Sequence, residues 1–104
     1  MGHRVAAGAL ADLDDAWYAV AKKSGVTAAD GLIDAITEKF LLLSQHRYLG
    51  RARKDDFGKG WRSFEVGEYV IVYFVEDRNL LVLRVMHWQR DLEPLFSDAP
   101  LEKS

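Results

Sequence analysis

Two side chains that could take part in chemistry lie in the most β-prone part of the chain. Arg84 and His87 both fall in the apolar run 80–88. An arginine at the centre of a strand is costly to bury unpaired, so Arg84 must meet a phosphate, water or a carboxylate such as Glu65, Asp91 or a partner's acid. The imidazole of His87 could act as a general base. We prefer the structural interpretation of both, an ion pair for Arg84 and a hydrogen-bonded core position for His87.

The densest group of cations lies in a polar, glycine-containing stretch at residues 46–60. Its basic residues are Arg47, Arg51, Arg53, Lys54 and Lys59. Such a group can bind phosphate, but two aspartates offset it, and a charge run is more often a solvated connection. The formal net charge of the chain is -2, so nucleic-acid binding would require a local basic patch. We expect no direct contact with nucleic acid.

Several common kinds of active site have no support in the sequence. The chain has no cysteine, which excludes disulfides and thiolate chemistry. The three histidines lack partners at metal-ligand spacing, and the glycines lack GxxxxGK order. We therefore expect no metal and no cofactor. The 104 residues show no signal peptide and no spanning segment, which predicts one cytoplasmic domain at 1–96, away from membranes, and a flexible tail at 97–104.

A three-stranded antiparallel meander is expected to position these side chains. Strands at 61–66 and 69–75 flank Gly67-Glu68, a tight-hairpin signature because glycine adopts positive φ at little cost. Four polar residues then lead to a third strand at 80–88. Residues 1–5 form at most a short additional strand. Leu92, Leu95 and Phe96 are expected to dock back onto the domain.

Two amphipathic helices are predicted before the meander. The first runs from residue 7 to 24 and stops at Gly25, and the second follows Thr27 as its N-cap and runs to about 44. Their apolar stripes are Leu10, Leu13, Trp17 and Val20 in the first, and Val26, Ala29, Ile33, Ile36, Phe40 and Leu43 in the second. The short connection makes them an antiparallel hairpin. The predicted fold class is α+β, an N-terminal α-helical hairpin packed on one face of a small antiparallel sheet.

The expected register assigns each strand residue to a face of the sheet. Val66 should pair with Tyr69, and Val75 with Leu80. This register predicts that the helices cover the drier face, which carries Val70, Val72, Phe74, Leu81, Leu83, Val85 and His87. The opposite face would then expose Tyr69, Ile71, Tyr73, Val82, Met86 and Trp88. A patch of that kind is unusual on a monomer, so we expect a segment of another chain to cover it.

A set of short motifs in the second half carries a family resemblance. They are Leu49-Gly50-Arg51, Arg62-Ser63-Phe64 before Val66-Gly67, Tyr69-Val70-Ile71 before Tyr73, Leu83-Arg84-Val85, and His87 before Arg90-Asp91-Leu92. In their order and spacing they resemble ParE-type toxins of the RelE/ParE superfamily. The helical hairpin is similar to the first half of that family, so the resemblance covers nearly the whole chain. Glu65 departs from the family pattern, where proline is common, and so does Trp88, where a small residue is common.

The resemblance implies the toxin of a type II toxin-antitoxin system, neutralised by a ParD-like antitoxin. ParE-like members are associated with inhibition of DNA gyrase, and RelE-like members with cleavage of messenger RNA. Cleavage would require a base and phosphate-binding cations, for which Arg62, Arg84 and His87 are the candidates. The predicted faces separate His87 from both arginines, and the chain is mildly acidic. We therefore favour a non-enzymatic gyrase inhibitor, with an endoribonuclease or a non-toxic member that only binds antitoxin as alternatives.

Two sets of contact residues are expected for such a toxin. The candidates for target binding are the arginines Arg51, Arg53, Arg62, Arg84 and Arg90. The candidates for antitoxin binding are the six residues of the predicted open face, Tyr69, Ile71, Tyr73, Val82, Met86 and Trp88.

Overall fold

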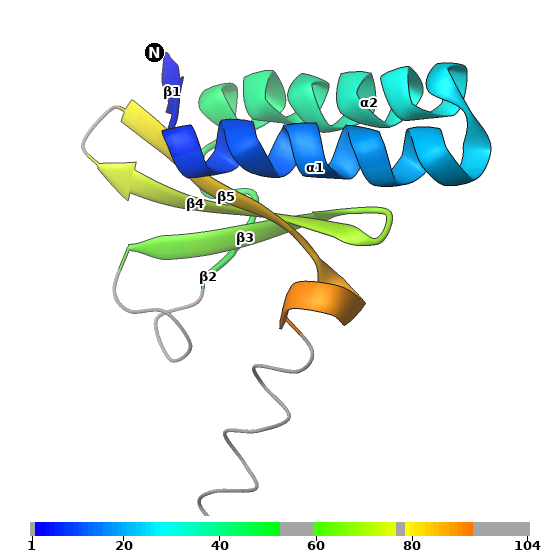
Figure 1. The fold of residues 1–104 in the computed structure, drawn as a ribbon. Helices are drawn as coiled ribbons and strands as arrows, with labels where there is room; N and C mark the ends of the chain where they lie inside the picture. Colours follow the sequence, from blue (N-terminus) through cyan, green and yellow to red (C-terminus); the bar gives the residue numbers. More distant parts are fainter. Residues whose placement is uncertain (1, 53–59, 77–78, 93–104) are drawn as a thin grey trace, which may run out of the picture.

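Two helices lie side by side on one face of a five-stranded sheet (Figure 1). The computed structural model describes residues 2–52, 60–76 and 79–92. The elements in chain order are β1 (His3–Val5), α1 (Ala7–Ser24), α2 (Val26–Gln45), β2 (Arg51–Ala52), β3 (Trp61–Val66), β4 (Tyr69–Glu76), β5 (Asn79–His87) and a short π-helical turn, η1 (Trp88–Leu92). The expectations for Arg53, Lys54, Lys59, Leu95, Phe96 and the tail at 97–104 lie outside the described residues.

The helical hairpin is confirmed, and α1 has the predicted bounds. Gly25 has a φ of 97°, and its N–H donates to the Ala21 carbonyl at 2.9 Å, which ends the helix. The Gly25 carbonyl in turn accepts the Ala29 N–H at 3.1 Å. The predicted N-cap at Thr27 is therefore wrong, because Gly25 alone joins the two helices and Thr27 already lies inside α2.

The buried stripe of α1 differs from the predicted one. Ala9 and Ala16 are fully buried, whereas Leu10 is 54% exposed. Two alanines spaced seven residues apart let the helix backbone approach the sheet closely, and the larger Leu13 packs at the margin of the core. The predicted stripe of α2 is largely confirmed, since Ala29, Ile36, Phe40 and Leu43 are buried, although Val26 is 57% exposed.

The sheet has the order β1-β5-β4-β3-β2, and its three long strands form the predicted antiparallel meander. The pairs Val66 with Tyr69 and Val75 with Leu80 are confirmed. The short N-terminal strand β1 also forms, but it runs parallel to β5, so the sheet is mixed and not purely antiparallel. The two-residue strand β2, which was not predicted, pairs with Ser63 and Arg62 at the other edge.

A β-bulge in β5 changes the predicted faces of its second half. Tyr73 pairs with Val82 as expected, but the preceding residue, Val72, pairs with Arg84. Leu83 is thus an extra residue on β5, and such an insertion reverses the alternation beyond it. Val85 consequently shares a face with Ile71, and the predicted pairing of Ile71 with Arg84 is wrong.

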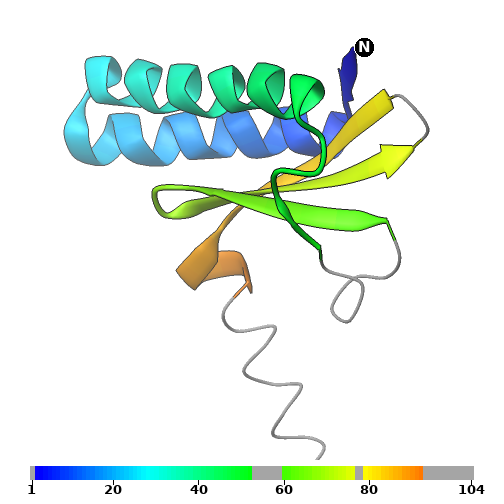
Figure 2. The same cartoon turned by 180° about the vertical axis from the view of Figure 1, so that it is seen from behind.

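The helices cover the opposite face of the sheet from the one predicted. Tyr69, Ile71, Tyr73 and Val82 are buried against residues of both helices, so their assignment to an open, partner-binding face is wrong. Both faces are largely apolar in the sequence, so the small difference in hydropathy on which the prediction was based did not identify the covered face. The other face carries a small cluster of Val70, Val72 and Leu92, with Met86 and Trp61 packed against it. Seen from behind, η1 lies on that side of the sheet, away from the helices (Figure 2). The expected docking of Leu92 is confirmed.

Candidate functional site

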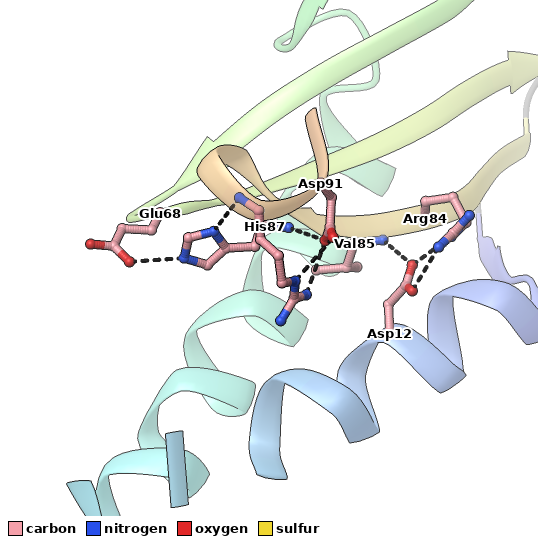
Figure 3. A network of polar contacts seen from close by, with 7 residues as sticks. Asp12, Glu68, Arg84, Val85, His87 and Asp91 are labelled. Carbon is pink, nitrogen blue, oxygen red and sulfur yellow. Dashed lines mark hydrogen bonds and ion pairs between the residues drawn. The ribbon is translucent and has the colours of Figure 1, made fainter. Parts of the chain in front are cut away.

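Arg84 forms an ion pair with a helix, as the structural interpretation expected, but its partner was not foreseen. Its Nε and a terminal nitrogen donate to the two carboxylate oxygens of Asp12 on α1, at 2.7 and 3.0 Å (Figure 3). This contact raises the pKa of Arg84. Gly8 lies against the Arg84 stem, where a Cβ would stand 3.2 Å from its Cδ. Neither Glu65 nor Asp91, the carboxylates proposed from the sequence, accepts from this guanidinium.

His87 is a hydrogen-bonded, partly buried histidine, as expected. Its Nδ1 accepts the backbone N–H of Arg90 at 3.1 Å, so in the neutral ring the proton lies on Nε2, which is 3.1 Å from the Glu68 carboxylate (Figure 3). The ring also packs edge-on against Tyr69 at 5.1 Å between centroids. Both ring nitrogens are therefore engaged in holding η1 and the β3–β4 turn against β5.

Asp91 holds η1 to the end of β5. Its carboxylate accepts two bonds from the Arg90 guanidinium, at 2.9 and 3.0 Å, and the backbone N–H of His87 at 2.9 Å. The Arg90 guanidinium, followed by the His87 N–H bond, holds the pKa of Asp91 below its usual range, although partial burial opposes this.

Two carboxylates cap the outer edge of β5. Strand β1 pairs with β5 only as far as Val82. Beyond it, the N–H of Val85 donates to Asp12 at 2.8 Å, and the N–H of His87 donates to Asp91. These are alternate residues, so both N–H groups point to the same edge. An unpaired strand edge is a template for strand addition, and these two caps occupy its donors.

Arg62 lies at the other side of the sheet, in a cluster around the buried hydroxyl of Tyr73. That hydroxyl donates to the Arg47 carbonyl at 3.0 Å and accepts the Gly50 N–H at 2.9 Å. Arg62 donates to the carbonyls of Gly50 and Tyr48, at 3.0 and 3.1 Å, and lies over the Tyr48 ring. The segment at 47–50 is thereby fixed to the sheet, and burial raises the pKa of Tyr73.

The structure does not bring Arg62, Arg84 and His87 together. Arg62 on β3 is aligned with Tyr73, and His87 on β5 is aligned with Tyr69, so the predicted separation of these two residues onto different faces is wrong. They are nevertheless far apart, because β4 lies between their strands. At 3.3 Å per residue their Cα atoms are about 13 Å apart along the strands, with two strand spacings, about 10 Å, between them. Each of the three side chains is directed to a different intrachain partner. One phosphate group could not contact all three in this arrangement.

The arginines considered for target binding are spread over the molecule. Arg51 is exposed on β2, and its side chain makes no hydrogen bond or ion pair with any residue that the structure describes. Arg62, Arg84 and Arg90 are held by the partners given above, and Arg53 lies outside the described residues. Within the described ranges no three histidine or acidic side chains are placed to hold a metal ion, and neither helix is long and apolar enough to cross a membrane.

A family model matches most of the chain, from β1 to the end of η1. The model is described as ParE toxin of type II toxin-antitoxin system, parDE, and it matches residues 4–92. The chain belongs to the ParE toxin family. It is the toxin component of a type II toxin-antitoxin system, and a ParE system implies an antitoxin as its partner.

Two known proteins are similar to this chain, one in sequence and one in fold. The chain is 30% identical to Toxin ParE3 of Caulobacter vibrioides over 81 residues, which cover 78% of this chain and 80% of that toxin. A solved structure, described as the chromosomal ParDE TA system from P. aeruginosa, has a TM-score of 0.73 and 21% identity. The match covers 84% of this chain and 95% of that chain, and it confirms the ParE fold.

The sequence did not reveal the roles of three acidic residues in the polar network beside β5, which are Asp12, Glu68 and Asp91. Asp12 was not singled out in the sequence, and Glu68 was considered only as part of a turn. Asp12 and Arg84 are 72 positions apart, so no local pattern links them. Asp91 had a weak local signal, because it follows Arg90 directly and could form a pair with it.

Proposed function

We propose that this protein inhibits DNA gyrase by binding it, and that an antitoxin neutralises it by binding the domain at 1–96. The toxin role follows from the family; the gyrase target is the activity that the family resemblance implies. Such a target would place its action in the cytoplasm. Inhibition by binding requires a complementary surface and no group that moves a proton.

The observation that carries this proposal is the separation of Arg62, Arg84 and His87. A ribonuclease needs a base beside cations that contact the same phosphate. Here the ring of His87 is bonded at both nitrogens, and the two arginines bind Asp12 and backbone carbonyls instead. The geometry therefore favours binding over RNA cleavage.

The antitoxin surface is best placed on the sheet face that the helices leave uncovered. Met86 and Trp88, two of the six residues proposed from the sequence, lie on that side, where Met86 packs beside Val70 and Trp88 is 38% exposed. The four remaining candidates are core residues and are not part of this surface. Partner surfaces are enriched in tryptophan and methionine, which supports this position.

A supercoiling assay tests the proposed target. Purified full-length toxin is added in excess to DNA gyrase with relaxed plasmid, with and without the cognate antitoxin, and supercoiling and cleaved DNA are measured. We expect inhibition that the antitoxin relieves. Unchanged gyrase activity together with cleaved messages in primer extension would indicate the ribonuclease, and no effect in either assay would indicate a non-toxic antitoxin binder.

Arg51 is the described arginine best placed to contact the target, because its side chain is exposed and is bonded by no residue in the described ranges. We expect Arg51→Glu to weaken gyrase inhibition about tenfold, as expected when a contact in an interface reverses its charge. Arg4→Glu is the matched control, since Arg4 is exposed on β1 at the opposite edge of the sheet. Equal dose-response curves for the two variants would exclude Arg51 from the gyrase contact.

A further inference from the structure

A cavity opens on the uncovered side of the sheet, where the β3–β4 turn meets η1. Its volume is about 360 Å³, and its lining residues are Glu65, Gly67, Glu68, Val70, Trp88 and Gln89. The register aligns Glu65 with Val70 and Val70 with Met86, so the cavity continues onto the face proposed to bind antitoxin. Val70 forms its apolar base, and the large indole of Trp88, 38% exposed, lines it.

Among the described residues, the only charged side chains that line this cavity are negative. Its six lining residues include two carboxylates and no cation. Glu65 is exposed and makes no hydrogen bond or ion pair with the residues that the structure describes. Glu68 has a side chain that is 79% exposed, and His87 engages only its Oε1, which leaves Oε2 available. An anion would be repelled here, whereas a cation would meet two acceptors.

The walls of the cavity are fixed before any partner binds. The N–H of Trp88 donates to the Glu68 carbonyl at 2.8 Å, which ties η1 to the turn. His87 bonds both Glu68 and the backbone of Arg90, and Asp91 bonds the backbone of His87. A preformed site loses less conformational entropy on binding, so these contacts favour recognition.

We infer that this cavity binds a basic side chain, preferably arginine, from the antitoxin segment that covers the open sheet face. A guanidinium stacks on a tryptophan ring and donates in a plane to carboxylates, and its apolar stem suits a base formed by valine. A lysine would satisfy the charge but not the planar geometry. The inference rests on the proposed antitoxin surface and not on the identity of the toxin's target.

The first test uses a small probe and the full-length toxin. N-acetyl-arginine methylamide is titrated against ¹⁵N-labelled protein, with the uncharged citrulline analogue as its isosteric control. We expect the arginine probe to shift the indole N–H of Trp88 and the amides of Gly67 and Glu68, and the citrulline probe to bind at least fivefold more weakly. Equal shifts from both probes, or shifts elsewhere on the protein, would overturn the inference.

Charge-matched variants locate the effect. Glu65→Gln with Glu68→Gln should weaken arginine binding about tenfold, since it removes both carboxylates while an amide can still accept from His87. The control is Glu38→Gln with Glu76→Gln, two exposed glutamates on α2 and at the far end of β4, which should leave binding unchanged. Equal binding by the two double variants would refute the role of these carboxylates. A further control is Lys103→Gln in the absence of any probe. If this substitution alone changes the chemical shifts of Trp88, Gly67 and Glu68 as the arginine probe does, the chain's own tail occupies the cavity and the inference is wrong.

Co-purification with the cognate antitoxin identifies the partner. Glu65→Lys with Glu68→Lys should reduce antitoxin recovery at least tenfold relative to Glu38→Lys with Glu76→Lys, with thermal unfolding used to confirm that both variants are folded. Equal recovery would overturn the assignment to the antitoxin. Neither probe binding nor antitoxin recovery involves gyrase. A negative supercoiling assay therefore does not affect these two results, and a negative result in either of them does not affect the gyrase proposal.

Discussion

Replacement of Asp12 by alanine is expected to destabilise the fold by about 2 kcal/mol. The Asp12 side chain is 12% exposed and accepts three hydrogen bonds, two from Arg84 and one from the Val85 N–H. Arg84 is half exposed, so its ion pair contributes only about 0.5–1 kcal/mol. The charge-assisted bond to the part-buried Val85 N–H contributes about 1.5–2 kcal/mol. The higher helix propensity of alanine offsets about 0.5 kcal/mol of this loss of stability.

Urea and thermal unfolding measure this effect directly. A loss of about 2 kcal/mol corresponds to a fall in Tm on the order of 10 °C for a domain of this size. Asp14→Ala is the matched control, because Asp14 is exposed on the same helix and has no partner among the described residues. Asp12→Asn should lose about half as much, since its amide oxygen can still accept the Val85 N–H.

A double-mutant cycle with Arg84→Ala separates the two contributions of Asp12. The coupling energy between Asp12 and Arg84 should be about 0.5–1 kcal/mol, and the remainder of the loss should persist without Arg84. If Asp12→Ala and Asp14→Ala unfolded at the same temperature, the cap on β5 would have no energetic role and the reasoning would be refuted.

Two further predictions concern groups with shifted pKa values. Tyr73→Phe should lower the free energy of unfolding, measured in urea, by about 2 kcal/mol, because the buried Gly50 N–H and Arg47 carbonyl both lose a hydroxyl partner. The control is Tyr18→Phe, at a position that is 64% exposed, which should cause no measurable loss. Equal losses in the two variants would contradict the prediction. The lowered pKa of Asp91 means that its carboxylate contributes stability above its unfolded pKa near 4, and that this contribution is lost as pH falls through the folded pKa. Urea midpoints measured from pH 6 to pH 2 should therefore fall less steeply for Asp91→Asn than for the parent or for Asp14→Asn, and parallel curves would be the opposing result.

The elements that short-range signals specify were predictable from the sequence. The end of α1 at Gly25 and the tight turn at Gly67 both depend on a glycine with positive φ, and both occur where expected. The pairing of β3 with β4 follows from that turn, and it is correct along the whole strand. The helix start at Thr27 was predicted wrongly because the residues there fit a capping pattern. In the structure Gly25 alone joins the helices, so α2 begins before Thr27.

The assignment of faces failed for two separate physical reasons. The bulge at Leu83 inserts one residue into β5, and no residue type there marks it, since an ordinary alternation could also run through Leu83. Tyr73 was placed on the open face because the opposite face is the drier one. Its hydroxyl can be buried because its partners come from residues 47 and 50, in a segment that was predicted as a polar loop. Contacts between distant segments decided the position of Tyr73, and no local signal marked the bulge, so the site residues were predicted less well than the fold.

The caps on β5 also constrain how a partner can bind. A strand added at the outer edge beyond Val82 would have to displace Asp12 from Val85 and Asp91 from His87, and would leave Arg84 and Arg90 without their acids. That replacement exchanges charge-assisted bonds for neutral backbone bonds, which are about half as strong. Main-chain pairing at this edge is therefore disfavoured. Recognition should depend instead on side chains that reach the uncovered face beside η1, where the Trp88 cavity offers a contact that distinguishes one partner sequence from another.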